Sequence, residues 1–226
     1  MTQHLLETGA AVQTGRRRFI RNITLAGTIG SAAVLTSEAA KADGLGGNET
    51  RRNFQDIQRH ENDHVAFLVS ALGANARPKP TFQNLLQPGF KMFFQVSQAL
   101  ENTGCGAYLG AAPVIFNRQI LAAAGSIALI EARHAGWLNT LVDARLTTNV
   151  FGQEQNFETP LTAAQVAQLA SPFVASLNGG PPLDYSTTPS AANDIAILNF
   201  ALALEYLEAD FYNLNVPRLH DGLDRG

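Results

Sequence analysis

The stretch that decides the fold is AGSIALIEARHAGWL, residues 124–138, which is apolar nearly all round. Glu131 and His134 stand three positions apart in it, so on an α-helix they share one face. A membrane span is the alternative for so apolar a stretch. Glu131, Arg133 and His134 within it favour instead a helix buried in a bundle. The sequence therefore predicts a core helix that turns an acid and an imidazole inward.

Three more helix-like stretches place acids among hydrophobic residues at helical spacing. They are RHENDHVAFLVSALG (residues 59–73, with Glu61 and His64), QVSQALENTGCGAYLGAA (95–112, with Glu101) and ILNFALALEYLEADFY (197–212, with Glu205). The order is a Glu-x-x-His helix, a Glu helix, a second Glu-x-x-His helix and a second Glu helix. This order indicates a twofold repeat of a helix pair.

Two Glu-x-x-His helices and two Glu helices supply the ligand set of di-iron and di-manganese four-helix bundles. Four carboxylates carry four negative charges, which two divalent cations would cancel. Buried without metal, each acid would cost roughly several kcal/mol. Oxygen-rich ligands with two imidazoles suit iron or manganese. We therefore predict two divalent ions of iron or manganese, held by Glu61, His64, Glu101, Glu131, His134 and Glu205.

Further residues lie near these candidates. Glu208, one turn after Glu205, is a second candidate ligand on that helix, with a base near the site or a solvated acid as alternatives. Tyr108 and Tyr212 each follow a candidate glutamate by seven residues, about two helical turns, so each shares its face. We expect the two tyrosines to hydrogen-bond ligand carboxylates, with plain core packing as the alternative. His60 is expected to lie at the rim of the site.

The composition bounds the class of protein. The chain has 226 residues, of which 46% are hydrophobic and 15% charged, as expected for one well-packed domain. Its formal net charge of −3 gives no basic footprint for nucleic acid. Cys105 is the single cysteine, so no internal disulfide is possible, and a buried inert thiol is expected.

The N-terminus has the features of an export signal. Residues 15–21 read Gly-Arg-Arg-Arg-Phe-Ile-Arg, a mildly apolar run follows, and Ala40-Lys41-Ala42 supplies a cleavage site. This resembles a twin-arginine (Tat) signal peptide, with Gly15 departing from the usual Ser or Thr. A basic amphipathic tail is the alternative. The resemblance implies the Tat machinery as a partner, a periplasmic or secreted protein, and no membrane span after cleavage.

The domain plan follows from helical periodicity and from turn residues. We expect a signal at 1–42, a linker at 43–52, a bundle at 53–216 and a frayed tail at 217–226. The bundle helices are expected at about 50–72, 90–111, 114–146 and 192–215, the last ending before Pro217. A long excursion, 147–192, is expected to hold one short helix that starts at a Thr162–Gln165 capping box and ends near residue 170.

These stretches, which span most of residues 53–215, resemble the ferritin-like superfamily. They are most similar to the ferritin-like domain of bacterial and plant desiccation-related proteins. In those families the Glu-Tyr helix opens the domain, whereas here residues 197–212 close it. The expected fold is thus an all-α ferritin-like four-helix bundle with permuted helix order, its last helix packed in its own chain or exchanged with a neighbouring subunit of a homo-oligomer.

The resemblance also implies a function. A di-iron or di-manganese site would act on oxygen or peroxide as a ferroxidase, peroxidase or catalase, in oxidative or desiccation stress. Two alternatives stay open. One is a metal-stabilised structural or interaction protein without turnover, and the other is iron storage.

Overall fold

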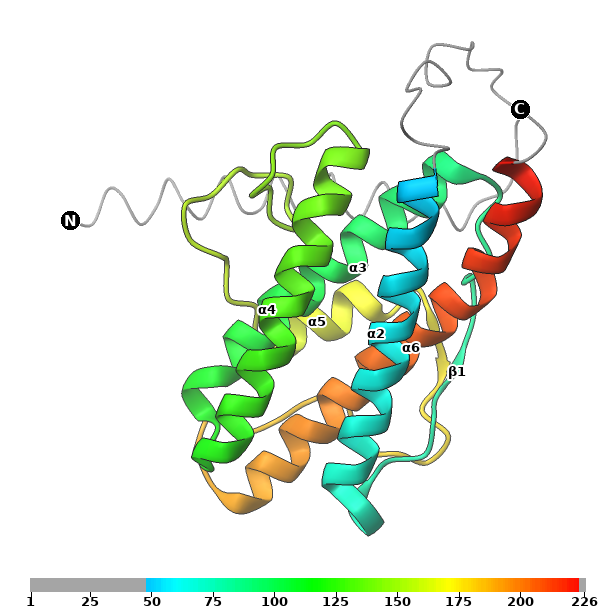
Figure 1. Cartoon of the computed structure of the whole chain (residues 1–226). Helices are drawn as coiled ribbons and strands as arrows, with labels where there is room; N and C mark the ends of the chain where they lie inside the picture. Colours follow the sequence, from blue (N-terminus) through cyan, green and yellow to red (C-terminus); the bar gives the residue numbers. More distant parts are fainter. Residues whose placement is uncertain (1–47, 224–226) are drawn as a thin grey trace.

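The computed structural model describes residues 48–223, and the predicted signal peptide at 1–42 lies outside the described residues. Four long helices run side by side (Figure 1). They are α2 (Asn48–Leu72), α3 (Phe90–Ala111), α4 (Arg118–Leu141) and α6 (Ala191–Leu223). This confirms the predicted all-α four-helix bundle.

Shorter elements join the long helices. Two 3₁₀ turns, η2 (Gly73–Asn75) and η3 (Ala112–Val114), follow α2 and α3. The strands β1 (Thr81–Phe82) and β2 (Val174–Ser176) pair antiparallel. The short helix α5 (Ala163–Ala170) has the predicted capping box, in which Thr162 and Gln165 each bind the other's backbone amide. No described helix is long and apolar enough to cross a membrane.

The helices pack as two pairs, α2 with α6 and α3 with α4, while α3 also contacts α6. The last helix therefore lies beside the first in its own chain, one of the two arrangements expected. Phe54, Phe93, Phe211 and Tyr212, each at most 1% exposed, pack together where the two pairs meet. The ring centroids of Phe54 and Phe93 are 4.7 Å apart, and those of Phe93 and Phe211 are 5.5 Å apart. This aromatic core fixes the pairs against each other.

The third long helix is shorter at both ends than predicted. It starts at Arg118 rather than near Val114, because Asn117 is extended and its side chain accepts hydrogen bonds from the first backbone amides. It ends at Leu141 rather than Leu146. There the Asn139 side chain donates to the carbonyl oxygens of Leu146 and Thr148, so the chain after Leu141 folds back against the end of the helix.

The two ends of the bundle also differ from the prediction. Helix α2 begins at Asn48, so it takes up half of the expected linker. Helix α6 continues through Pro217 to Leu223 rather than ending before the proline. Asn215 explains the continuation, because its side chain donates to the carbonyl oxygens of Leu85 and Phe211 and accepts from the amide of Gln87. These contacts hold α6 where proline removes a backbone hydrogen bond.

The excursion packs on α3 through two glycines. The Leu161 amide donates to the carbonyl oxygen of Gly106 at 2.9 Å. A Cβ atom at Gly110 would lie 1.8 Å from the Leu161 carbonyl oxygen, and one at Gly106 would lie 2.6 Å from Leu161 Cγ. The absence of a side chain at these two glycines thus allows the loop before α5 to lie directly on α3.

Candidate metal centre

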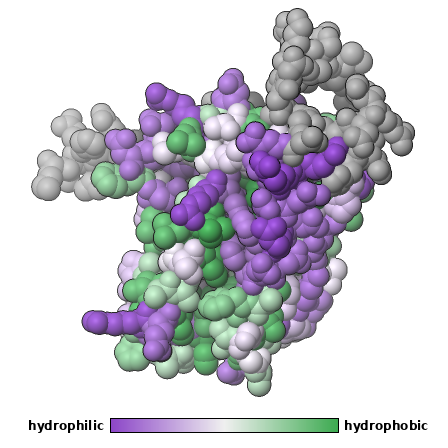
Figure 2. All heavy atoms as spheres, viewed as in Figure 1, coloured by the Kyte–Doolittle hydropathy of each residue, from purple (hydrophilic) through white to green (hydrophobic). Residues whose placement is uncertain are grey.

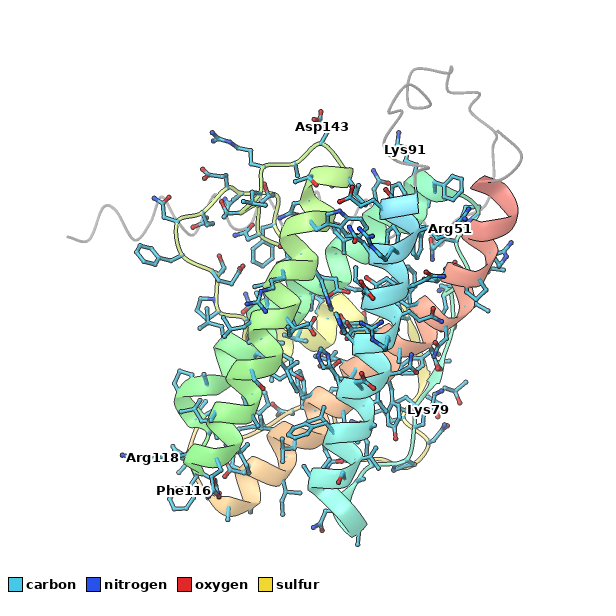
Figure 3. All side chains as sticks on the ribbon, viewed as in Figure 1. Arg51, Lys79, Lys91, Phe116, Arg118 and Asp143 are labelled. Carbon is cyan, nitrogen blue, oxygen red and sulfur yellow. The ribbon has the colours of Figure 1, made fainter. Side chains whose placement is uncertain are left out.

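Six of the predicted ligands meet in the middle of the bundle. Each long helix contributes, and the six are Glu61 and His64 of α2, Glu101 of α3, Glu131 and His134 of α4, and Glu205 of α6. The four glutamates are at most 1% exposed. The histidine side chains are 7% and 11% exposed. Outside the core, Lys79, Lys91, Arg118 and Asp143 point outward from the bundle (Figure 3).

The helix spacing accounts for this convergence. Glu61 and His64 face inward together, with His64 Nδ1 3.1 Å from Glu61 Oε2. The same i, i+3 spacing brings Glu131 and His134 to the opposite wall. Because α2 pairs with α6 and α4 pairs with α3, each Glu-x-x-His helix lies beside a helix that contributes one glutamate, Glu205 or Glu101, to the cluster.

The ligand atoms form a first group around His134. Its Nδ1 atom lies 3.0 Å from Glu101 Oε2 and 3.1 Å from Glu61 Oε1. Donor atoms of Glu61, Glu101, Glu131 and His134 all lie within 4.8 Å of one another. This group has the size and the donors of a metal position.

A second group surrounds His64. Its Nδ1 atom lies 3.1 Å from Glu131 Oε1 and 3.2 Å from Glu205 Oε2. Donor atoms of Glu61, His64, Glu131 and Glu205 lie within 4.8 Å of one another. Glu61 and Glu131 belong to both groups, so these two carboxylates are placed to bridge two ions.

The distances suit cations. Two donors at right angles around an ion, each about 2.1 Å from it, stand about 3 Å apart. The separations of 3.0–3.2 Å around the histidines match this spacing. In addition, no described group donates a hydrogen bond of good geometry to Glu61 Oε1 or to either Glu131 oxygen, although a histidine Nδ1 atom lies 3.1 Å from Glu61 Oε1 and another 3.1 Å from Glu131 Oε1. Buried carboxylate oxygens without donors are what a bound cation would satisfy.

Tyrosines orient the two unshared glutamates. Tyr212 donates to Glu101 Oε1 at 2.6 Å, and Tyr108 donates to Glu205 Oε1 at 2.5 Å. In each case the other carboxylate oxygen faces a histidine. The predicted hydrogen bonds are therefore present, although each tyrosine binds the glutamate of the other helix rather than of its own.

Glu208 lies near the cluster, buried at 3% exposure, but in neither group of four. Gly104, by contrast, belongs to the site in an unexpected way. A Cβ atom there would lie 2.9 Å from Glu131 Oε2, so the glycine provides the room for this carboxylate.

His60 contacts the site rather than lying only at its rim. Its Nδ1 atom is 2.9 Å from His134 Nε2, and the two rings lie parallel with centroids 5.2 Å apart. If His134 Nε2 carries the proton and donates it to His60 Nδ1, the Nδ1 atom of His134 is free to face an ion. His60 lies one turn before His64 on the same helix face, and this spacing is the sequence feature that could have placed His60 at the site.

When no metal is bound, protons on the histidines and on some glutamates offset part of the negative charge of the cluster. Burial lowers the pKa of His64 and of His134, but their carboxylate neighbours outweigh it and raise each to about 10. Burial raises the pKa of Glu61, yet the two histidines in contact with its carboxylate outweigh burial and lower this pKa to about 2. Burial, reinforced by the other glutamates, raises the pKa of Glu131 well above its usual value. Metal ions would have to displace these protons.

The fold and the site together define a helical bundle whose core carries a carboxylate and histidine cluster able to hold metal. Comparison with known families gives the same class. The ferritin-like domain family matches residues 26–144 and 193–222, more than half of the chain, and the chain belongs to this family. Comparisons with curated proteins and with solved structures give no match.

Proposed function

We propose that the protein holds two iron or manganese ions and uses them in redox chemistry with an oxygen-derived oxidant. The observation that carries the proposal is the pair of four-ligand groups sharing Glu61 and Glu131. With iron bound, each ferrous ion would supply one electron, and dioxygen would take two electrons and two protons to leave as hydrogen peroxide.

The residues of the chain have separate roles in this proposal. Glu61 and Glu131 would contribute to both metal positions, and one histidine and one further glutamate, Glu101 or Glu205, would complete each position. Tyr212 and Tyr108 fix the latter two carboxylates through their hydrogen bonds. The apolar surroundings exclude bulk water, which strengthens these interactions.

Export and stress protection belong to the same proposal. The Arg16-Arg17 pair and the Ala40-Lys41-Ala42 site support Tat transport to the periplasm, a route for proteins that fold before export. The similarity to desiccation-related proteins supports a role in oxidative or drying stress. Replacing Arg16 and Arg17 by Lys should keep the protein in the cytoplasm, and unchanged export would reject the Tat assignment.

The test starts with protein isolated from its own host. Mass spectrometry should find about two iron or manganese ions per chain, and the sample should consume oxygen or peroxide. Glu131→Ala and His134→Ala should each lose metal, whereas Glu49→Ala, at an exposed position of α2, should not. Full metal content without turnover would favour a structural role, and unchanged metal content in both site variants would overturn the site.

A further inference from the structure

Two apolar cavities adjoin each other beside the candidate metal centre. The outer one has a volume of about 170 Å³ and the inner one about 20 Å³. They have walls in common, formed by Tyr108, Ile120, Ala124 and Leu198. The two adjoining cavities are called here the apolar passage.

The outer end opens between α2 and α4, which pack mainly against other helices rather than against each other. Phe67, 45% exposed, stands at this mouth with Ala71 and Gln119. Hydrophobic residues gather over the lower part of this face of the molecule (Figure 2). A small apolar molecule thus meets a hydrophobic surface at the entrance.

The inner end reaches the metal centre. Gly104, Glu205 and Glu208 line the inner cavity, and Gly104 is the residue that abuts the Glu131 carboxylate. Glu208 is 3% exposed, and none of the hydrogen bonds found among the described residues involves its side chain. A ligand group and an unpartnered acid therefore face the space in which the passage ends.

The walls select what can travel along the passage. Apart from Gln119 at the mouth and the two acids at the end, the side chains are apolar, and the Tyr108 hydroxyl already donates to Glu205. An ion would lose its hydration there, and hydrogen peroxide would lose hydrogen bonds worth roughly 1–3 kcal/mol per unsatisfied group. Dioxygen has no charge and no strong hydrogen bond to lose.

Size points the same way. A water-sized molecule needs roughly 10–15 Å³ of such volume, so the inner cavity of about 20 Å³ holds one small molecule. An organic substrate does not fit there without displacing side chains.

We propose that the apolar passage between α2 and α4 is the entrance for dioxygen, and that Ala124 sets its width where the two cavities meet. The proposal rests on the proposed redox function and names dioxygen, rather than peroxide, as the oxidant delivered by this route. Iron itself must enter elsewhere, because the passage offers it no ligands before Glu205 and Glu208.

The first measurement tests the passage without any reaction. Crystals of the full chain under xenon pressure should bind xenon beside Tyr108, Ile120 and Ala124, because apolar cavities take up xenon. Crystals of Ala124→Phe should lose this site. Absence of xenon from the wild-type passage would overturn the proposal.

The second measurement tests the entrance. Iron-loaded Ala124→Phe and the milder Ala124→Leu should react with dioxygen about tenfold more slowly or worse, with unchanged iron content. Ala122→Phe, on the exposed face of the same helix, is the matched control and should react like wild type. The rate with hydrogen peroxide should fall less than the rate with dioxygen.

The outcomes separate the two proposals. A wild-type protein that binds iron but consumes neither oxygen nor peroxide rejects the proposed function, and the entrance role falls with it. Normal oxygen consumption by both Ala124 variants leaves the proposed function intact and overturns the entrance. Equal slowing with peroxide would show that the passage is not selective, which also overturns the assignment to dioxygen.

Discussion

Gly104→Ala should weaken metal binding without lowering the folding stability of the metal-free protein. The glycine lies inside α3, where alanine is more favourable to a helix by roughly 1 kcal/mol. The new Cβ atom, however, would stand 2.9 Å from Glu131 Oε2 and 3.5 Å from its Cδ atom. The carboxylate end must then shift by a few tenths of an ångström away from its present place.

That shift should cost metal affinity and not folding. Displacing a ligand through its support typically lowers metal affinity about 10- to 100-fold, or roughly 1.4–2.7 kcal/mol. The metal-free variant should unfold at the same temperature as wild type or higher, because only a flexible carboxylate has to move. Titration with ferrous or manganous ion under nitrogen measures the first quantity, and thermal unfolding of metal-free protein measures the second.

Gly125→Ala supplies the control. Gly125 lies in α4, and a Cβ atom there meets nothing within 4 Å. This variant should gain helix stability and bind metal as wild type does. If Gly104→Ala binds both ions as tightly as Gly125→Ala, Glu131 is not a ligand held by this contact, and the bridging assignment fails.

Three further results are expected. His60→Ala should weaken metal binding at the His134 position about tenfold, and added imidazole should restore part of the affinity. Unchanged metal binding would refute a role of His60 in positioning His134. Tyr212→Phe should also weaken metal binding, whereas Tyr206→Phe, outside the site, should not, and equal titration curves would contradict the assigned role. Loading at pH 7 should release between three and four protons, one each from His64, His134 and Glu131 and about half of one from Glu205, as an indicator dye can measure.

Protonation also sets the pH dependence of the metal-free protein. Folding raises the histidine pKa values from 6.5 to about 10, so this stabilisation is full below pH 6.5 and is lost as pH rises to 10. The raised pKa of Glu131 acts in the same direction, because the folded state binds more protons than the unfolded chain. Thermal unfolding temperature should therefore fall between pH 6.5 and 10, and a rise across this range would refute the argument.

The sequence predicted what depends on helical spacing. The pairs Glu61/His64 and Glu131/His134 face inward because i, i+3 spacing is a local property, and the bounds of α3 agree with its periodicity. The interior position of α2, α3, α4 and α6 followed from their apolar runs. Metal ligation itself stays a prediction.

What the sequence did not indicate depends on contacts between distant segments. The contact of His60 with His134 joins two helices, and Asn215 carries α6 past Pro217 by binding a loop 130 residues earlier. The role of Gly104 required the position of Glu131 on another helix. Such partners are set by packing, which a single sequence without homologues does not specify.

The order of the helices has a consequence for biosynthesis. Glu205 lies in α6, which the ribosome makes after the other three ligand helices. A nascent chain that has formed α2, α3 and α4 already has every donor of the His134 position, whereas the His64 position still lacks its terminal glutamate. If the protein holds two ions as proposed, the second ion would have to wait until α6 docks beside α2. A chain cut short before residue 205 would be limited to one complete position, so metal stoichiometry would report whether synthesis had run to the last helix.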